Sequence, residues 1–141
     1  MKFLGVDFGH KRVGLAVSDD LNITAQGLGF VHFTDIDQFI NHLAQLIENK
    51  GITSIVIGNP VNMSGKDSPG SRKVKDLAEK INKELNINVN LWDERLTTVS
   101  AQRILISANI TRKKRKEKVD SLAAQIMLQN FLDHLENSRQ M

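Results

Sequence analysis

The chain has 141 residues, of which 40% are hydrophobic and 25% charged, a composition typical of one globular domain with a buried core. It contains no cysteine, which excludes disulfides, thiolate metal ligands and cysteine nucleophiles. No apolar run approaches the roughly 20 residues that span a bilayer, and Asp7 interrupts the apolar start too early for a signal peptide. We therefore expect a single cytoplasmic domain over residues 1–141, with no membrane segment and a flexible tail from about residue 136.

Positive charge is concentrated in one short stretch of the chain. The formal net charge is +3, yet residues 112–118 hold six of the 19 basic residues and one of the 16 acidic ones. Such a patch binds polyanions, although a basic loop is also often only solvated. The candidate nucleic-acid contacts in this stretch are Arg112, Lys113, Lys114, Arg115, Lys116 and Lys118.

The first part of the chain predicts three strands. Residues 2–7 form an apolar run closed by Gly9, and residues 13–18 form a second run. The short link between these two runs indicates a β-hairpin. A third strand is expected within residues 24–33, where two glycines loosen the pattern. Together these strands indicate an antiparallel start to the sheet.

The middle of the chain predicts alternating helices and strands. Apolar residues at helical spacing indicate a helix over 36–47, and the short apolar run 54–58 is typical of a central parallel strand. Residues 61–70 have the composition of a loop. A second helix is expected over 74–85, with Ser71 as its N-cap.

The last part predicts one more strand and two helices. Residues 87–92 read as a strand that runs into Asp93, Glu94 and Arg95. A helix follows with Ala101, Ile104 and Leu105 inward, capped by Thr97 or Thr98, and a final amphipathic helix covers 122–135. This order indicates an α/β fold, a mixed five-stranded sheet flanked by helices.

Three acidic positions follow or begin these elements: Asp7, the pair Asp93–Glu94, and Asp120. Asp7 ends a buried strand, where a carboxylate is costly unless it is paired or binds a metal; accepting turn N–H groups is the ordinary alternative. Strand alternation directs Asp93 and Glu94 to opposite sides, so one of them is expected to face a shared site.

Asp120 is expected to open the final helix. Its ordinary interpretation is an N-cap, because aspartate is favoured there and its charge suits the helix dipole. However, Ala123 and Ala124 follow one turn later, and small side chains would let the helix approach the sheet closely. That approach would bring Asp120 towards the strand ends.

Carboxylates gathered from distant segments repel one another unless a cation lies between them. Mg²⁺ or Mn²⁺, which prefer oxygen ligands, would fill that role, and the four histidines show no metal-binding spacing. Lys11, Arg12 and Arg95 lie beside the acids and could bind phosphate groups. A carboxylate–metal site flanked by basic side chains suits hydrolysis of a phosphodiester, provided that the three acidic positions meet in space.

The same residues resemble the motifs of one family. Gly5–Asp19 closely resembles the opening motif of the YqgF/RuvX family, related to Holliday junction resolvases and regarded as pre-16S ribosomal RNA nucleases. Its other motifs resemble Asp93–Thr98 with Ala101, Lys118–Ala124, and the Gly-x-Pro segment Gly58–Gly65. Related resolvases end the fourth strand with a carboxylate, where this chain has Asn59.

The resemblance implies an RNase H-like fold and a metal-dependent nuclease that matures the 5′ end of 16S ribosomal RNA. It further implies Asp7, Glu94 and Asp120 as the catalytic, metal-binding set, with Asp93 as the alternate to Glu94. Branched DNA is the other possible substrate, and a junction resolvase would need two active sites and hence a homodimer, whereas trimming one RNA strand suits a monomer. A nucleic-acid binding module without hydrolysis remains an alternative, as does the phosphate-binding hairpin of the actin, Hsp70 and sugar-kinase ATPases.

Overall fold

The structure is a computed structural model that describes residues 1–9, 12–60, 68–93 and 112–140. For residues 112–120, 139 and 140 the description is limited to the helical backbone. Within these residues, no helix is both long enough and apolar enough to cross a membrane.

The centre of the molecule is one five-stranded sheet in the order β3-β2-β1-β4-β5. β1 pairs antiparallel with β2, which pairs antiparallel with β3, while β1–β4 and β4–β5 are parallel. The predicted mixed sheet with an antiparallel start is therefore confirmed. Its strands are β1 (Phe3–Phe8), β2 (Arg12–Ser18), β3 (Ala25–His32), β4 (Ser54–Asn59) and β5 (Asn88–Asp93).

Glycines fix the geometry of the β1–β2 hairpin and of the pairing between β2 and β3. The Gly9 N–H donates to the Arg12 carbonyl oxygen at 3.1 Å, and a Cβ at Gly9 would lie 2.6 Å from that oxygen, so the hairpin requires glycine there. On β3, Leu15 of β2 pairs with Gly29 but Ala16 pairs with Gly27, which leaves Leu28 as an extra residue. Gly29 takes a positive φ of 90° in this bulge.

Two helices, α1 (Ile36–Lys50) and α2 (Pro69–Leu85), follow β3 and β4. α1 begins after Asp35, whose carboxylate accepts the Gln38 N–H at 2.8 Å. Ser71 was the expected cap of α2, and this prediction is wrong. Ser68 is the N-cap and accepts the Ser71 N–H, because Pro69 suits the first helical position and starts the helix earlier.

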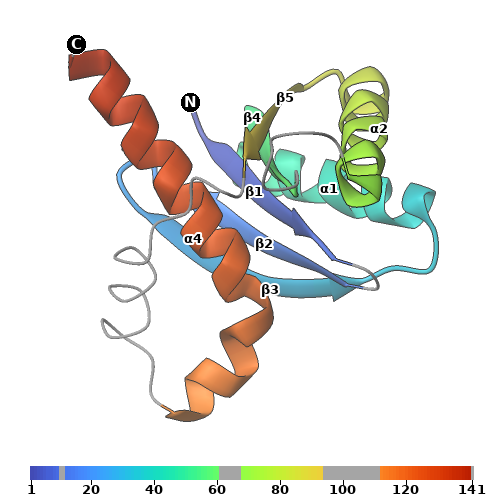
Figure 1. Cartoon of the computed structure of the whole chain (residues 1–141), viewed down its shortest axis with the longest axis horizontal. Helices are drawn as coiled ribbons and strands as arrows, with labels where there is room; N and C mark the ends of the chain where they lie inside the picture. The colour runs from blue at the N-terminus through green and yellow to red at the C-terminus, as the bar shows by residue number, and fades with distance from the viewer. Residues whose placement is uncertain (10–11, 61–67, 94–111, 141) are drawn as a thin grey trace.

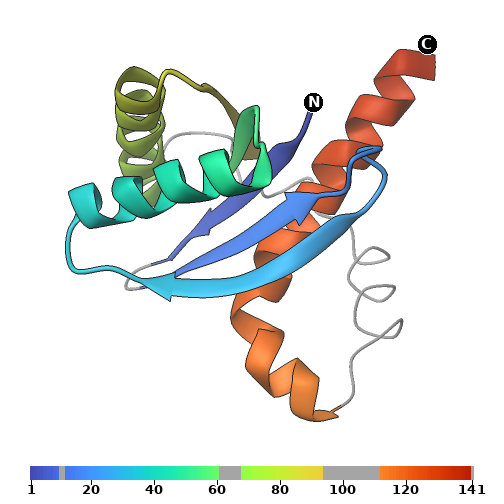
Figure 2. The ribbon, with the colours of Figure 1, turned by 180° about the vertical axis from the view of Figure 1, so that it is seen from behind.

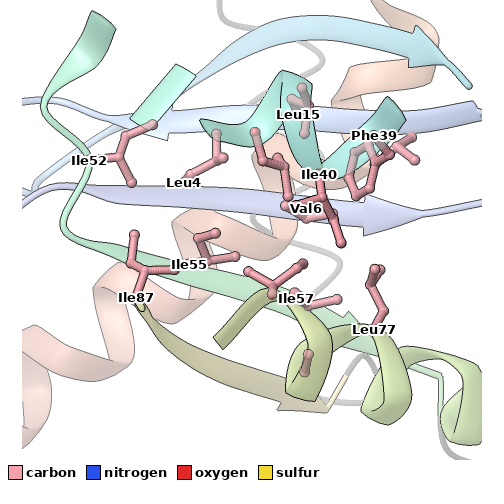
Figure 3. Close-up of a cluster of buried hydrophobic side chains, with 14 of the residues drawn as sticks. Leu4, Val6, Leu15, Phe39, Ile40, Ile52, Ile55, Ile57, Leu77 and Ile87 are labelled. Carbon is pink, nitrogen blue, oxygen red and sulfur yellow. The ribbon is translucent and has the colours of Figure 1, made fainter. Parts of the chain in front are cut away.

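α1 and α2 cover one face of the sheet and enclose the larger core there (Figures 2 and 3). Alternate residues of the central strands point into it, among them Leu4 and Val6 of β1 and Ile55 and Ile57 of β4. All four are fully shielded from solvent.

α4 (Arg112–Gln140) lies across the opposite face (Figures 1 and 2). The helix begins well before Asp120, so Asp120 is not its N-cap, and the basic run 112–118 is helical. It continues to Gln140, past the point where a tail was expected, because residues 126–132 anchor it and extension of an existing helix is favourable. The helix expected around Ala101–Leu105 lies outside the described residues.

Small residues let α4 lie close to the sheet. A Cβ added at Gly5 would be 3.0 Å from the Leu128 Cβ, and one at Gly27 would be 2.9 Å from the Ser121 Oγ. Ala124 is fully buried at this crossing, whereas Ala123 is exposed. The expected close approach is therefore present, with one alanine of the pair at the contact.

Candidate active site

Asp7 lies on the face of the sheet that α4 crosses. On β1, Leu4 and Val6 enter the core below α1 and α2, whereas the Phe3 ring meets Phe131 of α4 with ring centroids 5.2 Å apart. Side chains alternate along a strand, so Asp7 shares the face of Phe3 and Gly5. Asp7 is half-buried and is the next-to-last residue of β1.

Asp93 lies on the other face. Trp92 packs in the α4 core, where its ring centroid is 5.8 Å from that of Phe131, so the next residue points away from α4. Asp93 also pairs in register with Asn59, whose Oδ1 accepts the Ser71 hydroxyl of α2 at 2.7 Å. Of the pair Asp93–Glu94, Asp93 is thus separated from Asp7 by the sheet. Glu94 and Arg95 lie outside the described residues, as does Lys11.

Asp120 is part of α4, four residues before Ala124. Ala124 is fully buried against the sheet next to Gly5, where a Cβ on Gly5 would be 3.5 Å from the Ala124 carbonyl oxygen. The helix that carries Asp120 therefore crosses β1 on the face of Asp7. The six basic residues of the 112–118 run belong to the same helix.

Arg12 is exposed at the start of β2 and lies beside two aromatic residues of β3. Its guanidinium carbon is 5.4 Å from the centroid of the Phe30 ring, and the Phe30 and His32 rings meet edge to face at 5.2 Å. Sequence analysis did not single out Phe30 or His32. The bulge at Leu28 shifts the alternation on β3, so the face on which they lie could not be read from the sequence.

Asp19, the last residue of the opening motif, has a structural role. Its carboxylate accepts the Ile23 N–H at 2.7 Å and the Thr24 N–H at 3.1 Å in the turn from β2 to β3. These bonds, the one from Thr24 foremost, lower the pKa of Asp19 below its ordinary value. The residue closes a turn at the end of the sheet away from Asp7.

A cavity of about 370 Å³ is lined by Phe8, Phe33, Ile36 and Leu77 together with charged residues of α2. These apolar side chains belong to the core below α1 and α2, so the cavity lies across the sheet from Asp7. At its edge the Lys80 Nζ lies 3.4 Å from Asp37 and 3.5 Å from Glu84, and these carboxylates raise the pKa of Lys80. Over the described ranges, no three histidine, aspartate or glutamate side chains gather in one place.

The fold is that of the RNase H-like resolvases. RuvC of T. thermophilus, solved with a Holliday junction substrate, superposes with a TM-score of 0.59 at 13% identity, covering 99% of this chain and 96% of that one. The fowlpox virus resolvase, solved with Holliday junction DNA, gives a TM-score of 0.59 at 14% identity, covering 96% of this chain and 99% of that one. At such low identities the likeness concerns the fold alone.

Within that class, residues 1–134 match the family model RuvX, described as a Holliday junction resolvase. A relative in Carboxydothermus hydrogenoformans is 41% identical over 134 residues, which cover 95% of this chain and 97% of the relative. One in Bacillus thuringiensis is 42% identical over 135 residues, covering 94% and 98%. Both carry the name "Putative pre-16S rRNA nuclease". The chain belongs to the RuvX family, and the resemblance seen in its motifs is confirmed.

Proposed function

We propose that this protein is a cytoplasmic, metal-dependent nuclease that hydrolyses phosphodiester bonds in the 5′ segment of pre-16S ribosomal RNA. The names of its relatives support the substrate, since they share about 41% of their residues with this chain over nearly its whole length. The observation that carries the proposal is the placement of Asp7. It is a half-buried carboxylate near the end of β1, on the face crossed by the helix that carries Asp120.

Two further acids would complete the site. If the alternation of β5 continues beyond Asp93, the next residue, Glu94, would lie on the face of Asp7, opposite to Asp93, which favours Glu94 as the ligand. Asp120 is four residues from the buried Ala124, a spacing that puts both positions on one side of an α-helix. We expect Asp7, Glu94 and Asp120 to converge at the end of β1.

This set of donors fits Mg²⁺ or Mn²⁺, because it consists of carboxylate oxygens and includes no thiol. When bound, the ion polarises the phosphate and lowers the pKa of a water molecule. The three carboxylates would hold and orient the ion. Lys11, Arg12, Arg95 and the basic residues of 112–118 would bind backbone phosphates, contacts that position a strand without reading its sequence.

Cleavage of a 5′-labelled pre-16S leader RNA at increasing Mg²⁺ concentration tests this proposal. Asp7→Asn should lower the cleavage rate by about 10²-fold or more and leave RNA affinity largely unchanged, because a ligand is lost but the basic contacts remain. Asp93→Asn is the matched control, since it makes the same change on the opposite face and should cut normally.

Equal cleavage by Asp7→Asn and the unmodified protein at equal purity would refute the mechanism. Loss of cleavage in Asp93→Asn, but not in Glu94→Gln, would exchange the roles of the paired acids. A protein that binds RNA but forms no metal-dependent product would be the binding module instead.

Cleavage of branched DNA is the second candidate, favoured by the family description as a Holliday junction resolvase. A resolvase must cut two strands in a coordinated way, which requires two copies of the site. The two candidate substrates are distinguished by testing a four-way DNA junction in the same cleavage assay and measuring the mass of the complex by light scattering. Paired cuts by a homodimer favour the junction, whereas RNA cleavage by a monomer favours the leader.

A further inference from the structure

A row of three residues leads from Asp7 across the sheet to its edge. Asp7 pairs with Gly14 of β2, and Gly14 pairs with Phe30 of β3, so the three share one face. Neighbouring strands are about 4.8 Å apart, which puts Asp7 and Phe30 roughly 10 Å from each other along the row. Gly14 between them carries no side chain. The ends of β1 and β3 in this region extend beyond α4 (Figure 1).

A second row adds a cation and another ring. Arg12 pairs with His32 next to the first row, and both side chains are exposed. The Arg12 guanidinium lies over the Phe30 ring, and the His32 ring meets Phe30 edge to face. Two aromatic rings and one positive charge therefore form a continuous surface on the face of Asp7.

Phe30 is unusual among the phenylalanines of this chain, all six of which the structure describes. The other five, Phe3, Phe8, Phe33, Phe39 and Phe131, lie in or against one of the two cores, whereas Phe30 belongs to neither. Core packing therefore does not account for an aromatic residue at this position. Phe30 is half-buried and His32 is exposed, and accessible rings beside a basic side chain are the arrangement with which proteins stack unpaired bases and bind their phosphates.

We propose that Phe30, His32 and Arg12 bind an unpaired nucleotide of the substrate strand and thereby position the neighbouring phosphate at Asp7. The base stacks on the Phe30 ring, the His32 ring, which is perpendicular to Phe30, contacts the edge of that base, and Arg12 binds the adjoining phosphate. Bases in a duplex are already stacked on one another, so this surface selects single-stranded RNA over duplex. The inference rests on the proposed function and specifies its substrate.

Binding to a labelled single-stranded leader RNA, followed by fluorescence anisotropy without Mg²⁺, tests the proposal independently of cleavage. Phe30→Leu removes the ring but keeps an apolar side chain, and should weaken single-strand binding about tenfold. Binding of the same sequence as a duplex should be unchanged, and Phe30→Trp should retain affinity. Phe33→Leu is the matched control, because it makes the same change against the opposite core and should not alter RNA affinity.

A cross-linking measurement on the unmodified protein covers the case in which Phe30→Leu fails to fold. Leader RNA containing 4-thiouridine should cross-link at Phe30 or His32, located by mass spectrometry of the digested complex. Normal single-strand affinity of folded Phe30→Leu, or cross-links confined to other segments, would overturn the proposal. If Asp7→Asn abolishes cleavage at the same time, the nuclease assignment stands and the stacking surface alone is wrong.

Discussion

Replacing Gly27 by alanine tests how closely α4 must approach the sheet. The new Cβ would lie 2.9 Å from the Ser121 Oγ, inside ordinary contact distance, and Ser121 is only 1% exposed. Overpacking of this kind costs about 1–3 kcal/mol, while losing glycine's freedom in the unfolded chain returns roughly 0.4–1 kcal/mol. We expect Gly27→Ala to lower the free energy of unfolding by about 1 kcal/mol.

The hydroxyl is the atom responsible, which makes the prediction testable by rescue. Ser121→Ala removes the hydroxyl, and the nearest remaining atom of residue 121 is then its Cβ. That atom lies 3.7 Å from the new Cβ at position 27, an ordinary van der Waals contact. In urea unfolding, the double variant should therefore be about 1 kcal/mol more stable than the sum of the two single effects predicts. Additive single effects, or a Gly27→Ala protein as stable as the parent, would refute this account of the crossing.

Three further predictions concern other contacts. Gly5→Ala should lower the free energy of unfolding in urea by about 1–3 kcal/mol, because the new Cβ would lie 3.0 Å from the Leu128 Cβ. Leu128→Ala should not rescue this variant, since alanine retains that Cβ, and a rescue would contradict the explanation. Ser68→Ala should cost about 1 kcal/mol in thermal unfolding, since it removes the α2 cap, and no change would argue against that role. The lowered pKa of Asp19 means that its carboxylate stabilises the fold above the ordinary pKa and loses this effect as pH falls through the folded value. The melting-temperature gap between the parent and Asp19→Asn should thus be largest near neutral pH and shrink below about pH 4, and a gap independent of pH would exclude the effect.

The five strands and the antiparallel start of the sheet could be predicted from local patterns, because apolar runs separated by short links specify strands and hairpins. The face on which Asp7 lies required the contact of Phe3 with Phe131 of α4. That Asp93 and Glu94 point to opposite sides is an expectation from strand alternation. That Asp93 points away from Asp7 required the packing of Trp92 against α4, a contact between segments far apart in the chain.

The start of α2 was missed although its signal, a serine cap followed by proline, is local, whereas the start of α4 depends on tertiary context. Residues 61–70 have loop composition, yet Pro69 and Gly70 are helical because Ser68 caps the helix and Pro69 suits its first position. A run of like charges disfavours an isolated helix, but residues 112–118 extend a helix already anchored further along. Phe30 was missed for a third reason, since one extra residue in β3 reverses the alternation beyond it.

The two cores draw on different stretches of the polypeptide. The fully buried members of the core below α1 and α2 come from residues 4–87, whereas the other core needs residues 124–132 of α4 to cover the sheet. During synthesis from the N-terminus, α1 and α2 can thus cover one face of the sheet while the apolar residues on the opposite face are still exposed to solvent. Docking of α4 would cover that surface and, in the same step, bring Asp120 to the site proposed around Asp7.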